Sequence, residues 1–359
     1  MKTALVYDRI NKWGGAERDL LVLHEIFPTA PLFTSLYDAK KAPWAKIFPE
    51  VIPSFLQKIP LLPKKHEYLG TLMPFAFESF DFSDFDLVIS LTSEAAKGIL
   101  TKPETKHICI CLTPTRYLWS GYTEYFKNTV LKGISSPVVR YLRYWDKIAA
   151  QRPDVLIAVS GCVQQRIKKY YDRDSTIIYP PVELAKFRET KERIKKEAFY
   201  LVVSRLVPYK KVDLAIKAFN KLKLPLVIVG HGSEEFKLKK MAGANIRFIK
   251  ELTDEELCNY YKKAQALIFP QEEDFGKVVV EAHAAGTPVV AFKAGGALDT
   301  VEEGVNGVFF DKQNIDSLVG AIKRISKEKF DPEEISKTAS KFSKEVFRKK
   351  LSELINSYG

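Results

Sequence analysis

Residues 269–288, FPQEEDFGKVVVEAHAAGTP, contain the alternation of elements from which the whole chain is built. An apolar run ending at Phe269 predicts a buried strand, an acidic loop follows, and an apolar helical pattern begins near Gly276. Glu273 falls in the loop, and Glu281 falls on the helix about two turns further along. This order of strand, charged loop and helix is typical of one βα unit of an α/β protein.

Short apolar runs of the same kind recur along the chain and alternate with helical patterns such as 213–222, 254–264 and 278–285. They are continuous in Val, Ile and Leu, as expected of parallel strands that are covered on both faces. The sequence therefore predicts a doubly wound α/β architecture. The predicted strands are Thr3–Tyr7, Leu87–Leu91, His107–Leu112, Val155–Val159, Thr176–Tyr179, Tyr200–Ser204, Leu226–Val229, Ile246–Ile249, Ala266–Phe269, Pro288–Phe292 and Gly307–Phe310.

The length of the chain and an interruption in its alternation of strands and helices predict two domains. At about 150 residues per domain, 359 residues correspond to two units, occasionally three. The alternation is interrupted by YPPV at 179–182 and by the charged run 188–196, a composition typical of an interdomain linker. We expect a first domain over 1–182 and a second over 183–341. The helical pattern at 342–359 is expected to pack back on the first domain.

Composition excludes several classes of protein. An apolar fraction of 46% and a charged fraction of 28% exclude a disordered or fibrous chain. No stretch of about 18 apolar residues lacks a charge, and the start has no secretory pattern, so we expect a cytosolic protein. The four cysteines form no C-x-x-C pair, and Cys109 and Cys111 are expected in a buried strand.

The net charge of +12 favours anionic partners without choosing among nucleotides, phospholipid headgroups and nucleic acid. A solvated, lysine-rich surface accounts for much of this charge. The basic residues are dispersed and no nucleic-acid-binding motif is present, so nucleic acid is the least favoured of these partners.

The two glutamates of the opening stretch have a possible chemical role. Amides at the helix start receive an anion or a sugar hydroxyl, and Gly276 permits close approach. A carboxylate at Glu281 suits the two hydroxyls of a ribose. Taken alone, two solvated glutamates beside a buried helix remain the more frequent situation.

Five segments of the carboxyl-terminal half resemble, in order and spacing, motifs of the retaining glycosyltransferases of family 4. They are Glu273 and Glu281 as the acids of E-x7-E, residues 203–213 (VSRLVPYKKVD) for G-R-L-x-x-x-K-G, residues 226–232 (LVIVGHG) for a strand ending in G-x-G, Leu252–Leu257 with Tyr260–Ala264, and Gly295-Gly296 with Gly304–Gly307.

The resemblance implies two Rossmann-like domains facing across a cleft, the GT-B arrangement, with a nucleotide-sugar donor on the second domain. It implies that Glu273 holds sugar hydroxyls and that Glu281 holds the ribose. Arg205 and Lys210 would stabilise the charge of the leaving nucleoside diphosphate. The residues expected to bind the donor are Gly14, Gly15, Gly230, Glu273, Phe275, Gly276 and Glu281.

The chain departs from this pattern at two positions of the basic loop. Ser204 replaces the usual glycine before Arg205, and Lys211 replaces the usual glycine after Lys210. Neither change removes a charged group. The sequence does not decide whether Lys210 or Lys211 contacts the phosphate of the donor.

In the amino-terminal half, Gly14-Gly15 resembles the family's glycine loop, and residues 109–119 (CICLTPTRYLW) resemble C-x-C-H-T-P-x-R-Y-x-W of bacterial polysaccharide enzymes, often mannosyltransferases. Leu112 stands where a histidine beside the donor sugar is usual. Arg116, Tyr117 and Trp119 are candidates for contact with sugar or acceptor, and the two aromatic residues are equally compatible with core positions.

The resemblance implies a retaining hexosyltransferase, and the absence of a metal-binding pattern predicts that it is metal-independent. It would move a hexose, mannose first, from a GDP- or UDP-linked donor to a glycan or lipid-linked acceptor. No cofactor is expected, and the histidines show no metal-ligand spacing. The segment 84–86 (DFD) precedes a strand, so it does not stand where a metal-dependent transferase places its acids. A non-catalytic nucleotide-sugar-binding or scaffold relative is the alternative, and Leu112 is its support.

Two stretches interleave aromatic and basic residues, Phe55–Phe80 and Tyr122–Lys147. Such stretches suit peripheral attachment to an anionic membrane at its inner face. An insertion packed into the first domain, with a basic outer face, is the alternative.

Overall fold

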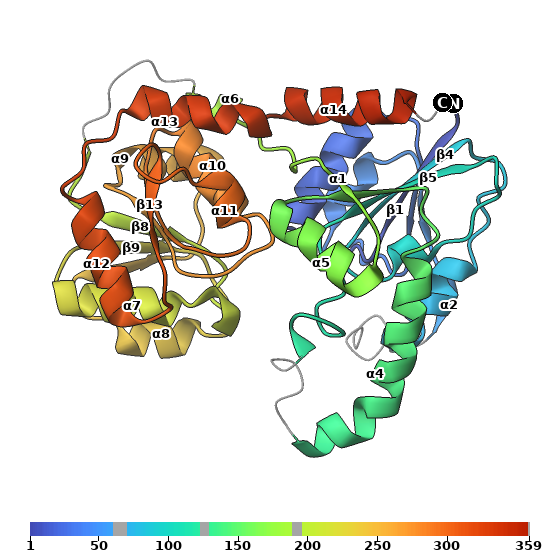
Figure 1. Ribbon diagram of the computed structural model, residues 1–359, viewed down its shortest axis with the longest axis horizontal. Helices are drawn as coiled ribbons and strands as arrows, with labels where there is room; N and C mark the ends of the chain where they lie inside the picture. The colour runs from blue at the N-terminus through green and yellow to red at the C-terminus, as the bar shows by residue number, and fades with distance from the viewer. Residues whose placement is uncertain (60–69, 123–128, 189–195, 358–359) are drawn as a thin grey trace. The chain divides into compact units, whose positions relative to one another are not determined.

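The computed structural model describes residues 1–59, 70–122, 129–188 and 196–357, and it divides into two compact units. Unit 1 is Met1–Tyr179 and unit 2 is Pro180–Gly359 (Figure 1). The division therefore falls three residues before the predicted boundary at Val182. Contact of the last helix with the first domain stays a prediction.

Unit 1 contains a seven-stranded, wholly parallel sheet in the order β3-β2-β1-β4-β5-β6-β7. Its described helices flank this sheet (Figure 1). The strands are β1 (Thr3–Tyr7), β2 (Leu32–Thr34), β3 (Val51–Pro53), β4 (Leu87–Thr92), β5 (Lys106–Cys111), β6 (Val155–Ala158) and β7 (Thr176–Ile177). The helices are α1 (Gly15–Ile26), α2 (Met73–Glu78), α4 (Thr129–Ala149) and α5 (Gly161–Tyr171), with short 3-10 turns at Pro43–Ile47, Phe55–Lys58 and Ala96–Gly98.

Unit 2 contains a six-stranded parallel sheet in the order β10-β9-β8-β11-β12-β13. Its strands are β8 (Tyr200–Val203), β9 (Leu226–Val229), β10 (Ile246–Ile249), β11 (Leu267–Phe269), β12 (Val289–Phe292) and β13 (Gly307–Phe310). Its helices are α6 (Ala185–Arg188), α7 (Val212–Leu222), α8 (Glu235–Met241), α9 (Asp254–Lys263), α10 (Lys277–Ala284), α11 (Ala297–Thr300), α12 (Ile315–Ile325), α13 (Pro332–Thr338) and α14 (Lys344–Asn356), with 3-10 turns at Pro208–Lys210 and Ala339–Phe342.

The predicted fold class of two Rossmann-like α/β domains is confirmed. Every strand expected from the sequence is present with bounds within two residues. Cys109 and Cys111 are buried in β5, as expected. The sequence missed β2 and β3, because each has only three residues and β3 ends in a proline.

In both sheets the strand order reverses at one place. The reversal lies between β1 and β4 in unit 1 and between β8 and β11 in unit 2. Open α/β sheets bind ligands outside the carboxyl ends of the strands at such a switch point. The loops that follow β1, β4, β8 and β11 are therefore the first places to examine for chemistry.

None of the helices in the described part of the chain is long and apolar enough to cross a membrane.

Candidate functional site

At the carboxyl edge of unit 2, the loops after β8 and β9 pack backbone against backbone, and the turn after β11 packs on an aromatic ring. Gly230 follows β9 with φ +135, and a Cβ there would lie 2.0 Å from the carbonyl oxygen of Ser204. Gly276 begins α10 with φ +89, and a Cβ there would lie 2.8 Å from the ring of Phe269. Glycine is required at both positions, because an L side chain meets both backbone strain and a steric clash.

An ion pair spans the switch point of unit 2. Lys210, in the loop after β8, contacts the carboxylate of Glu273, in the loop after β11. The same carboxylate oxygen accepts a hydrogen bond of 2.8 Å from Nε2 of Gln271. The two charged side chains are 11% and 20% exposed, so the pair is shielded yet open at one side. The structure thus brings together two residues that the sequence placed in one site.

The two lysines of the basic loop have different surroundings, and which of them meets a phosphate stays a prediction. Lys210 closes a 3-10 turn, and its ammonium lies 5.2 Å from the ring centroid of Tyr209. Arg205 is exposed and donates from Nη2 to the hydroxyl of Tyr209 at 2.5 Å. Lys211 instead adopts left-handed backbone angles, φ 52 and ψ 29, at the start of α7. The glycine usual at this position has a conformational reason, and Lys210 is the lysine beside the acid.

Replacing Lys211 tests the backbone argument. Lys211→Gly should raise the free energy of unfolding of unit 2 by about 0.5–1 kcal/mol, because relief of left-handed strain exceeds the added entropy of the unfolded chain. Lys211→Val should lower it by about 1 kcal/mol, because a β-branched residue tolerates this region least. Scanning calorimetry measures both. A destabilised Gly variant would show that the side chain, not the backbone, matters here.

Glu281 lies deeper than the sequence suggested. It is 5% exposed on α10, and its Oε2 accepts a hydrogen bond of 3.0 Å from the hydroxyl of Tyr261. Phe275 is also buried, with its ring 5.4 Å from that of Phe342. A ligand therefore reaches only the small exposed part of Glu281, whereas Glu273 is the more open acid.

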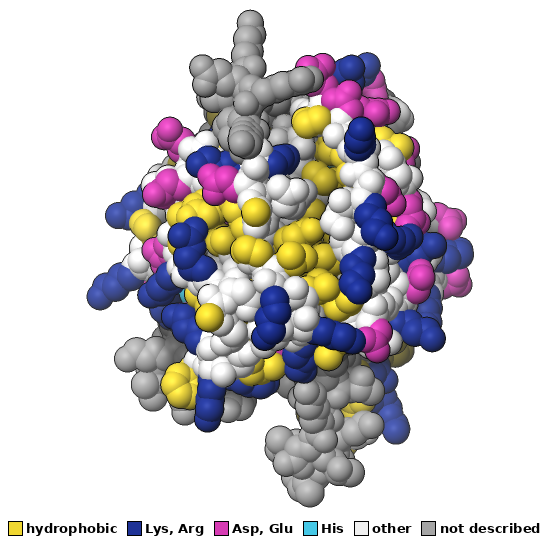
Figure 2. Space-filling view, turned by 90° about the vertical axis from the view of Figure 1, so that its left-hand side faces the viewer, with side chains coloured by type: hydrophobic (Ala, Val, Ile, Leu, Met, Phe, Trp, Pro, Cys, Tyr) yellow, Lys and Arg dark blue, Asp and Glu magenta, His cyan; other side chains and the backbone are white. Residues whose placement is uncertain are grey.

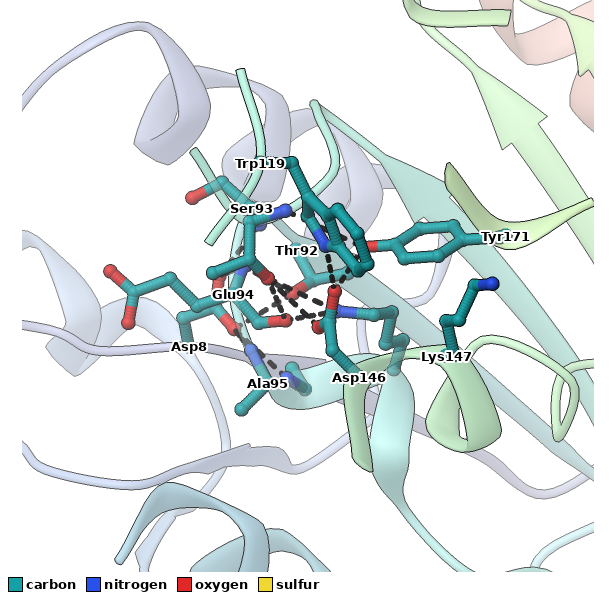
Figure 3. Close-up of polar contacts among 12 residues, drawn as sticks. Asp8, Thr92, Ser93, Glu94, Ala95, Trp119, Asp146, Lys147 and Tyr171 are labelled. Carbon is teal, nitrogen blue, oxygen red and sulfur yellow. Dashed lines mark hydrogen bonds and ion pairs between the residues drawn. The ribbon is translucent and has the colours of Figure 1, made fainter. Parts of the chain in front are cut away.

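In unit 1, a buried aspartate organises the switch point. The carboxylate of Asp8, just after β1, accepts from the hydroxyl of Thr92 at 2.8 Å. It also accepts from the four consecutive backbone N–H groups of residues 93–96, at 2.7–3.0 Å (Figure 3). Asp8 thereby fixes the loop after β4, which carries Glu94. The side chain of Glu94 forms an ion pair with Arg9, the residue that follows Asp8.

A second buried acid ties this loop to the rest of unit 1. Asp146 of α4 pairs with Lys97 at 2.5 Å, and the two side chains are 1% and 2% exposed. Asp146 also accepts from the hydroxyls of Thr115 and Tyr171, at 2.9 and 2.8 Å, and from the indole of Trp119 at 2.7 Å (Figure 3). Burial opposes the charge of Lys97, but Asp146 outweighs it and raises the pKa of the lysine.

Breaking this buried pair should be costly. Lys97→Met should lower the free energy of unfolding of unit 1 by about 3–5 kcal/mol, because an unpaired carboxylate is left in the interior. Lys102→Met, at an exposed lysine, should change it by less than about 0.5 kcal/mol. All four tryptophans lie in unit 1, so tryptophan fluorescence in urea follows this unit alone. Equal stabilities of the two variants would contradict the assignment.

The residues expected to contact sugar or acceptor are engaged within unit 1. Trp119 stacks on Tyr170 with ring centroids 5.1 Å apart. Tyr117 packs beside the apolar cluster around Leu118, and burial raises the pKa of its hydroxyl. Arg116 is half-buried. These contacts show what Tyr117 and Trp119 do inside the unit, and any contact with sugar stays a prediction.

The other expected residues of unit 1 lie at element ends. Leu112 is half-buried, and its backbone N–H donates to the carbonyl of Thr92 at 2.8 Å. Gly14 and Gly15 begin α1, and Gly14 has extended angles. Glu17, on the first turn of this helix, is buried and accepts from the hydroxyl of Tyr7 at 2.6 Å. The glycine loop thus stands at the same sheet edge as Asp8.

Sequence reasoning missed Asp8, Arg9, Glu94, Lys97 and Asp146. Asp8, Arg9 and Glu94 lie one to three residues after predicted strands, and charged residues at that place were the available signal. Lys97 and Asp146 carried no such signal, since a lysine and an aspartate in helical segments are usually solvated. Within the described ranges, no group of three or more His, Cys, Asp or Glu residues is placed to hold a metal ion.

Comparison with known families supports the resemblance over part of the chain. Residues 185–342 match the family described as Glycosyl transferases group 1. An uncharacterized glycosyltransferase of Methanocaldococcus jannaschii is 29% identical over 218 residues, which are 58% of this chain and 59% of the relative. D-inositol 3-phosphate glycosyltransferase 2 of Catenulispora acidiphila is 30% identical over 185 residues, 43% of each chain. The chain thus spans about half the length of these relatives.

Solved structures match nearly the whole chain in fold. HepE of Anabaena in complex with UDP has a TM-score of 0.74 at 20% identity and covers 99% of this chain and 100% of its own. Sucrose-phosphate synthase of Thermosynechococcus elongatus has a TM-score of 0.75 at 17% identity, covering 100% and 99%. The chain therefore shares the fold of two Rossmann-like units with these structures, and its segment 185–342 matches the family Glycosyl transferases group 1.

Proposed function

We propose that this protein is a metal-independent retaining glycosyltransferase of family 4 that transfers a hexose from a nucleotide sugar. The observation that carries the proposal is the Lys210–Glu273 ion pair at the switch point of unit 2, within the segment that matches the family. A cation and a carboxylate at this edge suit a diphosphate and the hydroxyls of the sugar beside it.

The proposed roles follow from charge and position. As the bond between the sugar and the diphosphate breaks, negative charge develops on the leaving phosphate. Arg205 and Lys210 stabilise that charge, most strongly in the transition state. The acceptor oxygen forms the new bond to the sugar on the same face, and its proton passes to the departing phosphate oxygen. Glu273 orients the sugar hydroxyls, and the exposed part of Glu281 contacts the ribose.

The identities of the donor and of the acceptor are further parts of this proposal. The segment 109–119 resembles mannose enzymes, which makes GDP-mannose the first donor to test. HepE is described with UDP and with UDP-glucose, which makes UDP-glucose the second. The acceptor is a glycan or a lipid-linked glycan. Several relatives are named D-inositol 3-phosphate glycosyltransferases, so a phosphorylated polyol belongs in the same test.

Two other hypotheses are less well supported. A non-catalytic relative rests on Leu112 alone, whereas the charged pair of unit 2 is intact. A nucleic-acid-binding protein needs a concentrated basic surface. On the face shown in Figure 2, Lys and Arg side chains are scattered around an apolar area, with Asp and Glu among them.

The acidic residues provide the direct test of the donor site. Glu281→Ala should weaken nucleoside diphosphate binding by about 1.5–3 kcal/mol, through loss of a charged hydrogen bond. Glu273→Ala should leave this affinity nearly unchanged and abolish most sugar transfer. Isothermal titration calorimetry with UDP and GDP measures the affinities, and Glu272→Ala, at an exposed neighbour, is the matched control. Equal affinity in the wild type and all three variants would contradict the assignment of Glu281.

Peripheral membrane attachment from the cytosolic side is a second proposal, and one face of α4 favours it. Val138, Tyr141, Tyr144 and Ile148 are 42%, 46%, 68% and 42% exposed, although all are apolar or aromatic. Arg140 and Lys147 are exposed beside them. An exposed helix face that mixes aromatic and basic side chains suits the interface of an anionic bilayer.

The described residues that remain available for membrane contact are fewer than the two predicted stretches contain. Residues 60–69 and 123–128, with Lys127 among them, and the side chain of Lys132 lie outside what the structure describes. Arg143 turns inward and donates to the carbonyl of Leu118 at 2.6 Å. Several apolar residues of the two stretches are buried in unit 1, as the alternative of an insertion packed into the first domain predicts. They are Leu56, Met73, Phe77 and Trp145.

Vesicle binding tests the remaining face. Neutralising Arg140 and Lys147 to Gln and changing Tyr141 and Tyr144 to Ser should reduce co-sedimentation with phosphatidylglycerol vesicles at least about tenfold, since each basic residue contributes about 1 kcal/mol. Attachment should also weaken with added salt. Lys217→Gln with Lys221→Gln, on α7 of unit 2, is the charge-matched control. Equal pelleting with phosphatidylcholine vesicles, or none with either lipid, would remove the proposal.

A further inference from the structure

The two units carry charged pairs at topologically equivalent places. In unit 2, Lys210 follows β8 and Glu273 follows β11, the two strands at the switch point. In unit 1, Arg9 follows β1 and Glu94 follows β4, again the two strands at the switch point. In each unit the cation comes from the loop after the first strand and the acid from the loop after the fourth.

The side chains of the two pairs are also exposed to solvent to a similar extent. Arg9 and Glu94 are 21% and 19% exposed, close to the 11% and 20% of Lys210 and Glu273. The Lys97–Asp146 pair of unit 1 is sealed in comparison, at 2% and 1%. A sealed pair serves the fold alone, whereas the Arg9–Glu94 pair remains open to a ligand at the sheet edge.

The loop that carries Glu94 is held rigidly before any ligand arrives. Asp8 binds the N–H groups of residues 93–96 from one side. The carbonyl of Glu94 accepts a hydrogen bond from the ammonium of Lys97. A carboxylate fixed in this way loses little entropy when it binds, which is the requirement for a preorganised binding group.

A small cavity lies directly beside this loop. Its lining includes Glu94, Ala95, Thr115 and Tyr117, and the cavity lies wholly within unit 1. Its wall is almost entirely apolar and it has room for about one water molecule, so it does not hold a sugar ring. A ligand hydroxyl would instead meet Glu94 at the exposed part of the Arg9–Glu94 pair.

We propose that Glu94, positioned by Arg9 and by the Asp8-anchored loop, binds a hydroxyl group of a polyhydroxylated acceptor, either a sugar or a cyclitol. The proposal rests on the proposed function, because it gives unit 1 the acceptor side of the same reaction. Glu94 then does for the acceptor what Glu273 does for the donor sugar. Arg9 is a positioning residue, since it acts by orienting the carboxylate.

Acceptor saturation kinetics test the proposal in the full-length chain. Release of nucleoside diphosphate from GDP-mannose and from UDP-glucose is measured with increasing methyl mannoside, methyl glucoside or inositol phosphate. Glu94→Gln should raise the half-saturating acceptor concentration roughly tenfold or more, since a charged hydrogen bond is lost. Affinity for UDP and GDP, measured by calorimetry, should not change. Glu94→Asp, which keeps the charge, should recover part of the loss.

The control is Glu104→Gln, the same change at an exposed acid before β5, hence at the opposite edge of the sheet. It should match the wild type throughout. An unchanged half-saturating concentration in Glu94→Gln would overturn the proposal and leave Arg9–Glu94 a structural pair. Nucleotide binding by a wild type that none of the three acceptors stimulates would overturn the acceptor class. A wild type that binds no nucleotide would instead overturn the proposed function itself.

Discussion

Parallel strand direction is the constraint on which both candidate sites depend. It places the carboxyl ends of all strands of a sheet on one edge, so loops far apart in sequence meet there. Arg9 and Glu94 are 85 residues apart, and Lys210 and Glu273 are 63 apart, yet each pair is in contact. The reversal of strand order occurs at that edge, and the charged loops follow the two strands on either side of the reversal.

Burial separates the charges that support the fold from those available for chemistry. Lys97 and Asp146 are closed off and fully partnered, and removing one member would leave a charge in a medium that does not solvate it. The Lys210–Glu273 pair keeps part of its surface in contact with solvent. A ligand can therefore exchange for one partner of this pair at a smaller desolvation cost, as a binding site requires.

Much of the fold and part of the site could be predicted from the sequence. Continuous Val and Ile runs such as Leu226–Val229 have no other interpretation in an alternating chain. The resemblance of the segments around Glu273 and Lys210 to family motifs predicted the candidate site of unit 2. The sequence did not show that Glu281 is mostly buried, because helical spacing alone does not tell which face a neighbouring helix covers. At Lys211 the sequence showed only that a lysine replaces the glycine usual in the family. The left-handed backbone angles of this residue explain why glycine is usual there.

The contacts of unit 1 were harder to foresee for a physical reason. Asp8 binds residues 93–96, and such a contact exists only when β1 and β4 are neighbours. Nothing local in the sequence around Asp8 indicates this pairing, because three-residue strands on the far side of β1 gave too weak a signal to establish strand order. Long-range hydrogen bonds of this kind follow from topology, and topology was the least constrained part of the prediction.

Hydrogen–deuterium exchange with and without nucleotide tests the central claim, that the carboxyl edge of unit 2 at its switch point receives a nucleoside diphosphate. With UDP or GDP at saturation, backbone amides of residues 204–211 and 270–277 should exchange more slowly, and those of the opposite edge, such as 223–226 and 243–246, should not change. Protection confined to the opposite edge or to unit 1, or no protection by either nucleotide, would contradict the account.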